Sequence, residues 1–69
     1  MKNSIRELRE ARGWSQTDLG RQVGVTRQAI LAIEEDKHDP SISLAARIAQ
    51  AFDVPLEKVF DLRSARYRG

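Results

Sequence analysis

The segment Gln16–Glu35, QTDLGRQVGVTRQAILAIEE, determines the fold expected for this chain. Leu19 and Val23 lie four residues apart, so they share one face of a helix. Gly24 interrupts that helix at a point where a residue able to adopt positive φ is needed. Thr26 is then a favourable N-cap for another helix. The segment therefore predicts two short helices joined by a tight turn.

The second of these helices has two chemically different faces. Ile30 and Ile33 lie on one face, which we expect to be buried. The other face carries one cationic, one amide and two apolar side chains: Arg27, Gln28, Leu31 and Ala32. A guanidinium and an amide can each form two hydrogen bonds with base edges in the DNA major groove. This pattern predicts a helix-turn-helix whose second helix reads duplex DNA.

Length and composition predict one small helical domain. The chain has 69 residues, of which 41% are apolar and 6% aromatic, which suits a small core of leucine, isoleucine, valine and alanine. It has no cysteine, which excludes disulfides and thiolate metal sites. The apolar runs are too short for a signal peptide or a membrane span, so we expect a cytoplasmic protein with no membrane partner.

Charge is distributed unevenly, although the formal net charge is only +2. Residues 1–33 carry six basic and three acidic side chains, residues 34–61 carry three and seven, and residues 62–69 add three arginines. The net charges of these segments are therefore +3, −4 and +3. The first positive segment contains most of the helix-turn-helix, which favours a polyanionic partner. The alternative is a scatter of surface charge without functional meaning.

Capping residues mark a first helix before the central segment. Asn3 or Ser4 can cap its start, and Gly13 is suited to end it. Trp14 follows, and we expect it to anchor this junction to the core. Ser15 is then the N-cap of the helix that begins the central segment.

Two more helices are expected after the polar loop EDKHDP. Ser41 can cap a fourth helix, whose apolar side chains are spaced four apart: Leu44, Ile48 and Phe52. Pro55 is suited to the opening of a fifth helix, whose apolar side chains follow: Leu56, Val59 and Phe60. No strand pattern, repeat or linker is present.

The end of the chain is basic and lacks helical periodicity. We therefore place a DNA-binding domain at residues 1–62 and a basic tail, RSARYRG, at residues 63–69. The arginines of this tail form either a solvated end or an arm that contacts DNA: Arg63, Arg66 and Arg68.

From about residue 5 to residue 60 the chain resembles the lambda-repressor-like, Cro/C1 or XRE-type, helix-turn-helix family. The resemblance is carried by IRELREARGWSQTDL, VGVTRQAI, the glutamate Glu34, and PSISLAARIAQAF with VPLEKVF. It implies an all-α, compact five-helix bundle and a small stand-alone transcriptional regulator. It also implies double-stranded DNA as the partner, with no cofactor and no small-molecule ligand.

The mode of action expected from this resemblance is repression by a homodimer on a two-fold-symmetric operator. The dimer surface is expected beside the fifth helix, from the parts of several apolar side chains that the core leaves exposed: Val54, Leu56, Val59, Phe60, Leu62 and Tyr67. The alternative is a protein-interaction module, because the same fold occurs in antitoxins and phage-type regulators that bind a protein partner.

The resemblance also assigns roles to individual residues. Base contacts are expected from one face of the reading helix: Arg27, Gln28, Leu31 and Ala32. Phosphate contacts are expected around it: Ser15, Gln16, Thr26 and Lys37. Arg9 and Glu34 resemble a structural pair that ties the first helix to the end of the third. The alternative for each DNA contact is an ordinary solvated helix residue, or in Leu31 a tolerated exposed apolar side chain.

The chain departs from the family pattern in three places. Glu35 and Asp36 stand where a glycine often follows the third helix, and Asp53 replaces a glycine after the fourth. Aspartate tolerates left-handed geometry, so we expect both turns to survive. Gly20 replaces the usual alanine, which weakens the helix by about 1 kcal/mol. Glu35 and Asp36 also lie near the expected phosphate path, where their charge would repel DNA.

An enzyme is not expected. His38, Asp39 and Ser41 are close in sequence, which could suit a hydrolase, but they lie in a polar loop of a domain with little room for a pocket. A single histidine without cysteine is a poor basis for a metal site, and no glycine-rich phosphate loop occurs.

Overall fold

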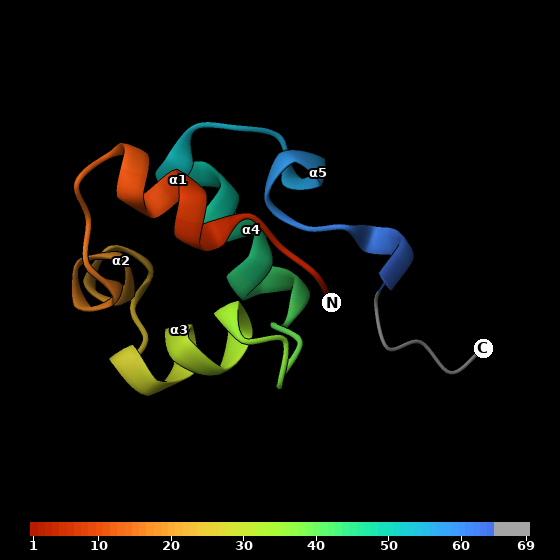
Figure 1. Ribbon diagram of the computed structural model, residues 1–69, viewed down its shortest axis with the longest axis horizontal. Coiled ribbons are helices and arrows are strands. Elements are labelled where there is room, and N and C mark those ends of the chain that lie inside the picture. The colour runs from red at the N-terminus through yellow and green to blue at the C-terminus, as the bar shows by residue number, and fades with distance from the viewer. Residues whose placement is uncertain (65–69) are drawn as a thin grey trace.

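The computed structural model describes residues 1–64, and the predicted all-α architecture is confirmed over this range (Figure 1). Its elements in chain order are α1 (Ile5–Ala11), α2 (Gln16–Val23), α3 (Arg27–Glu34), α4 (Ile42–Phe52), α5 (Leu56–Val59) and the 3-10 helix η1 (Leu62–Ser64). The predicted boundary between domain and tail thus falls inside η1. Arg66, Tyr67 and Arg68 lie outside the described residues, so their proposed roles stay predictions.

Side-chain caps begin three helices at the predicted residues. The hydroxyls of Ser15, Thr26 and Ser41 each accept a hydrogen bond from the backbone N–H three residues further on, at 3.0, 3.2 and 3.1 Å. In α2, Asp18 completes a capping box by accepting the N–H of Ser15 at 2.8 Å. The start of α1 differs, because Ser4 makes no side-chain cap and the Asn3 side chain accepts the N–H of Ile5 at 3.1 Å.

Residues with a left-handed backbone conformation form the turns between several of the helices. Gly24 ends α2 with φ +80°, as its position predicted. Asp36 and Asp53 occupy the same region of φ, at +59° and +56°, after α3 and α4. Both aspartates therefore replace glycine without loss of the turn.

The core is formed by apolar side chains of α1 to α5, among them the faces predicted for α2 to α5. The largest fully buried side chains come from all of these helices and from the residue after α5: Ile5, Leu19, Ile30, Ile33, Ile48, Phe52, Val59 and Phe60. Trp14 anchors the α1–α2 junction, as expected, by stacking on Phe52 with ring centroids 5.5 Å apart. Arg12 covers both rings, with its guanidinium carbon 5.9 and 5.1 Å from their centroids.

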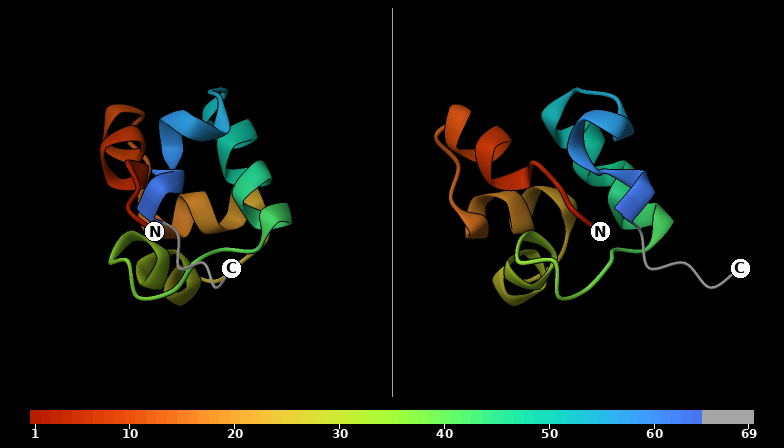
Figure 2. Two further views of the ribbon diagram at one scale, coloured as in Figure 1. Left: turned by 90° about the vertical axis from the view of Figure 1, so that its right-hand side faces the viewer. Right: turned by 45° about the vertical axis from the view of Figure 1, so that its right-hand side comes forward.

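The helices pack mainly through α2 and α4, and the chain's first residues pair with those around the end of α5. α2 contacts both α3 and α4, and α5 lies against α4, as the views of Figure 2 show. Residues 2–4 run antiparallel to residues 59–61, with Ser4 N–H donating to the Val59 carbonyl at 2.7 Å and Asp61 N–H donating to the Lys2 carbonyl at 2.8 Å. No local pattern predicts this short pairing, because its two segments are far apart along the chain.

Candidate nucleic-acid interface

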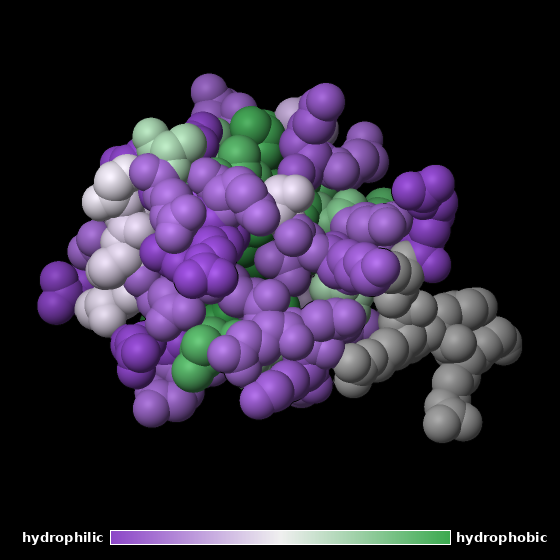
Figure 3. Space-filling view, in the orientation of Figure 1, coloured by the Kyte–Doolittle hydropathy of each residue, from purple (hydrophilic) through white to green (hydrophobic). Residues whose placement is uncertain are grey.

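The two faces predicted for α3 are present. Ile30 and Ile33 are buried against the core, while Arg27 and Gln28 in the first turn are exposed. Leu31 and Ala32 follow on the outer side and are half-buried. In Figure 3 the surface over α3 is mostly hydrophilic, with one small apolar area. The first turn of α3 therefore offers one guanidinium and one amide to a partner, beside a small apolar contact.

A buried ion pair holds the opposite end of α3. Arg9 of α1 donates to the carboxylate of Glu34 from Nε at 2.7 Å and from Nη2 at 3.3 Å, and from Nη1 to the Trp14 carbonyl at 2.9 Å. Arg9 is only 8% exposed, and the Glu34 side chain only 7%. The hydrogen bonds with Glu34 raise the pKa of Arg9 further above its usual range. The expected structural pair therefore exists and has the two-pronged geometry of strong pairs.

Gln16 joins the same network. Its Nε2 donates to Glu34 Oε1 at 3.2 Å, so the carboxylate binds α1, α2 and α3 together. These residues line a shallow hollow of about 200 Å³ with Arg6, Leu31 and Glu35. A primary amide has two N–H donors. Within the described contacts one of them is used, which leaves a donor at the start of α2 for an anion.

Ser15 and Thr26 lie exposed at the starts of α2 and α3. Their hydroxyl oxygens accept the capping hydrogen bonds, but a hydroxyl also carries a proton that it can donate. Capping and a phosphate contact are therefore compatible in one side chain. Both residues also stand beside the positive end of a helix dipole, which favours an anion there.

Lys37 lies in the loop after α3, and its side chain is 74% exposed. It forms an ion pair with Glu35 at 3.2 Å. An exposed pair of this kind is weak, so a phosphate can compete for the ammonium group. The loop thus presents the expected cation, held beside an acid of the same loop.

Sequence reasoning missed the contribution of the first residue. The α-amino group of Met1 forms ion pairs with Asp36 and Asp39, the latter at 2.5 Å. Asn3 adds a hydrogen bond from Nδ2 to the Ile33 carbonyl at 2.8 Å. A separation of thirty residues or more leaves no local signal for these contacts. The sequence signal that could have indicated these contacts is the excess of acids over lysine in EDKHD, which favours pairing with a cation from another part of the fold.

Comparison with known proteins agrees with this geometry. The sequence profile of a helix-turn-helix family, HTH_3, matches residues 5–59. The chain belongs to this family. It is 50% identical over 60 residues to YgzD of Bacillus subtilis, an uncharacterized HTH-type transcriptional regulator, covering 87% of this chain and 91% of that protein. A similar regulator of Methanocaldococcus jannaschii, MJ0272, is 45% identical over 60 residues, with the same coverage of both chains.

Solved structures show the same fold. The restriction-modification controller protein C.AhdI from Aeromonas hydrophila superposes with a TM-score of 0.75 at 30% identity, covering 81% of this chain and 85% of that one. The chain is accordingly a regulator with a helix-turn-helix DNA-binding domain, and this class is not an enzyme class. Within residues 1–64, no helix has the length and apolar character needed to cross a membrane.

Proposed function

We propose that this chain binds duplex DNA of a particular sequence in the cytoplasm and represses transcription from it. One observation carries the proposal: Arg27 and Gln28 are exposed on the first turn of α3, while the far end of that helix is fixed by a buried ion pair. Arginine favours a guanine edge and glutamine an adenine edge. The residues assigned to base contact are Arg27, Gln28, Leu31 and Ala32.

Phosphate contacts would orient the helix in the groove. The four residues assigned to them lie at the starts of α2 and α3 and in the loop after α3: Ser15, Gln16, Thr26 and Lys37. Contacts of this kind give salt-dependent affinity for any duplex and carry no sequence information. Discrimination therefore falls to the first turn of α3, where each good bidentate contact is worth on the order of 1–3 kcal/mol.

Selection of bound duplexes from a random pool tests the proposal. The native chain should enrich one sequence, and the R27A/Q28A variant should lose that enrichment while it stays folded. The chain offers a matched control in Arg21 and Gln22, an exposed pair of the same two residue types on α2. The R21A/Q22A variant should enrich the native sequence. A native chain that retains duplexes only weakly and without preference would instead identify a protein-interaction module.

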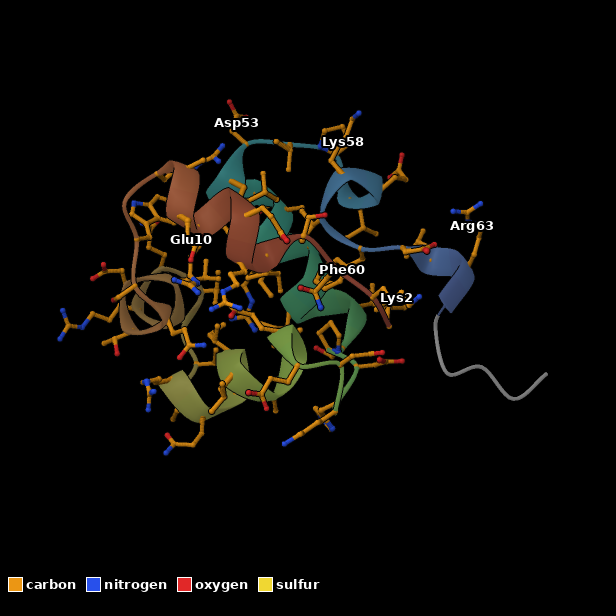
Figure 4. The ribbon with its side chains drawn as sticks, viewed as in Figure 1. Lys2, Glu10, Asp53, Lys58, Phe60 and Arg63 are labelled. Atoms are coloured by element: carbon orange, nitrogen blue, oxygen red, sulfur yellow. The ribbon has the colours of Figure 1, made fainter. Side chains whose placement is uncertain are left out.

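We further propose that the chain acts as a homodimer through the side formed by α5 and η1. Leu62 is 50% exposed there and lines a groove of about 450 Å³. Val59 and Phe60, which were also expected to contribute, are buried in the core, so Leu62 is the exposed apolar side chain of this groove. Charges of both signs border the groove, among them Lys58, Arg63 and Glu57, as a self-complementary surface requires. Lys58 and Arg63 point outward on this side in Figure 4.

Sedimentation velocity tests the dimer surface. L62E should dissociate the dimer, because it places a charge in the expected apolar contact. Ile42 supplies the control, since it is 88% exposed at the start of α4. I42E should leave the dimer intact. Equal dissociation by both variants, or by neither, would contradict this surface. In the selection experiment, a dimer should also enrich two half-sites about 34 Å apart.

A further inference from the structure

Arg6, an exposed residue of α1, lines the hollow beside the outer face of α3. It shares this hollow of about 200 Å³ with Gln16 of α2 and Leu31 of α3. The proposed function assigns Gln16 to a phosphate contact and Leu31 to a base contact. In Figure 1, α1 lies above α2 and α3, so the three helices border one region of the molecule. The guanidinium of Arg6 therefore belongs to the same side as the proposed interface.

Among the residues that line this hollow, Arg6 is the cation that is open to a ligand. Arg9 and Glu34 line it as well, but they are buried and bonded to each other. Glu35 is the acid that borders the hollow, and its ion pair with Lys37 at 3.2 Å offsets part of its charge. An anion that enters the hollow would therefore be attracted mainly by the guanidinium of Arg6.

Arg6 and Gln16 both have donors to offer. The Arg6 side chain is 72% exposed, and its ion pair with Glu10, at 3.6 Å, is exposed as well. A pair of this kind is weak, so a phosphate can compete for the guanidinium and accept two hydrogen bonds from it. Gln16 has a second N–H besides the one bonded to Glu34. The two side chains thus suit one anion from two helices.

We propose that Arg6 is a further phosphate-binding residue, and that Arg6 and Gln16 bind the same phosphate of the DNA backbone in the hollow between α1 and α3. The inference rests on the proposed function, and it adds α1 to the helices that contact DNA. The contact supplies affinity for any duplex and no sequence preference. Because Leu31 lines the same hollow, a phosphate held there also sets how the outer face of α3 lies against the groove.

The test is ethylation interference with the duplex that the native chain enriches from a random pool. An ethyl group removes the charge of one phosphate, so binding is lost wherever that phosphate is contacted. The native chain is compared with R6A, Q16A and R21A. Arg21 is the matched control, because it is an exposed arginine on α2 that does not line the hollow. Fluorescence anisotropy at several salt concentrations gives the affinities, and thermal unfolding shows that each variant is folded.

R6A should bind about fivefold more weakly, and its plot of log affinity against log salt should be shallower by about 1. R6A and Q16A should both become insensitive to ethylation of one and the same phosphate, whereas R21A should keep the native pattern. The inference is wrong if R6A keeps the native pattern, if R6A and Q16A lose different phosphates, or if R21A loses the phosphate that R6A loses. A native chain that enriches no duplex would instead overturn the proposed function.

Discussion

The two ends of α3 are built in opposite ways. At its C-terminal end, the Glu34 side chain is buried and bonded to Arg9 and Gln16, and the Ile33 carbonyl accepts a hydrogen bond from Asn3. At its N-terminal end, Arg27 and Gln28 are exposed, and Arg27 takes part in none of the ion pairs found among the described residues.

This difference separates the end of α3 that is held by the fold from the end for which we propose DNA recognition. A short helix on a small domain is positioned accurately when one of its ends is fixed by packing. A helix held in this way loses less conformational entropy when it binds a partner. The other end can then vary in sequence at little cost to the fold. We expect substitutions at the fixed end to lower stability, and those at the open end to alter binding alone.

The largest effect is expected from breaking the buried pair. R9A leaves the Glu34 carboxylate buried without its cation, so the free energy of unfolding should fall by about 3 kcal/mol. R6A on the same helix is the control, because Arg6 forms only an exposed pair with Glu10 at 3.6 Å. It should cost less than about 0.5 kcal/mol. Urea unfolding measures both variants, and equal losses would contradict a special role for the fixed end.

A smaller effect is expected where α2 meets the turn before α3. A Cβ added at Gly20 would lie 2.7 Å from the backbone oxygen of Val25. The backbone would have to shift to relieve this clash. Overpacking costs about 1–3 kcal/mol, and the gain in helix propensity returns about 1 kcal/mol, so G20A should lose about 1 kcal/mol. Q22A, on the exposed side of α2, should lose nothing. A G20A variant more stable than the native chain would show that the turn adapts freely.

Gln16 lies between the two ends and should show a mixed effect. Q16A removes the hydrogen bond to Glu34, which should lower stability by on the order of 1 kcal/mol. It also removes a predicted phosphate donor, so affinity should fall equally for all duplexes while discrimination stays native. Titrations with a selected and a scrambled duplex measure this. A change in their affinity ratio would assign Gln16 to base recognition.

The smallest effect is expected from acidification at the start of α2. The Ser15 backbone N–H holds the pKa of Asp18 below its usual 3.8. This carboxylate therefore contributes stability above about pH 3.8, and the contribution is lost as pH falls through its lower pKa in the folded chain. D18N should be less stable than the native chain at neutral pH, and the gap should close in acid. Urea unfolding at a series of pH values measures the gap, and a gap that is constant with pH would contradict the capping role.

The helix caps and turns could be predicted from the sequence because they depend on interactions between residues close together in the chain. Ser15, Thr26 and Ser41 cap the predicted helices, since a hydroxyl meets a backbone donor three residues away in any fold. Asp36 and Asp53 adopt the left-handed geometry expected of them. The resemblance to a family added the pair of Arg9 and Glu34, which spacing alone could not supply. The roles in DNA binding remain predictions, because they depend on a partner.

By itself, the sequence determined the five α-helices, the side-chain caps of α2, α3 and α4, the two faces of α3 and the exposure of Arg27 and Gln28, because periodicity and capping act over a few residues. Only the tertiary structure decided how the acids after α3 are balanced. Met1 and Asn3 reach that end of the helix because residues 2–4 pair with residues 59–61, and this pairing exists only after the bundle has closed. The fold brings together opposite charges that are far apart in the sequence, and no local sequence pattern predicts which of them will meet.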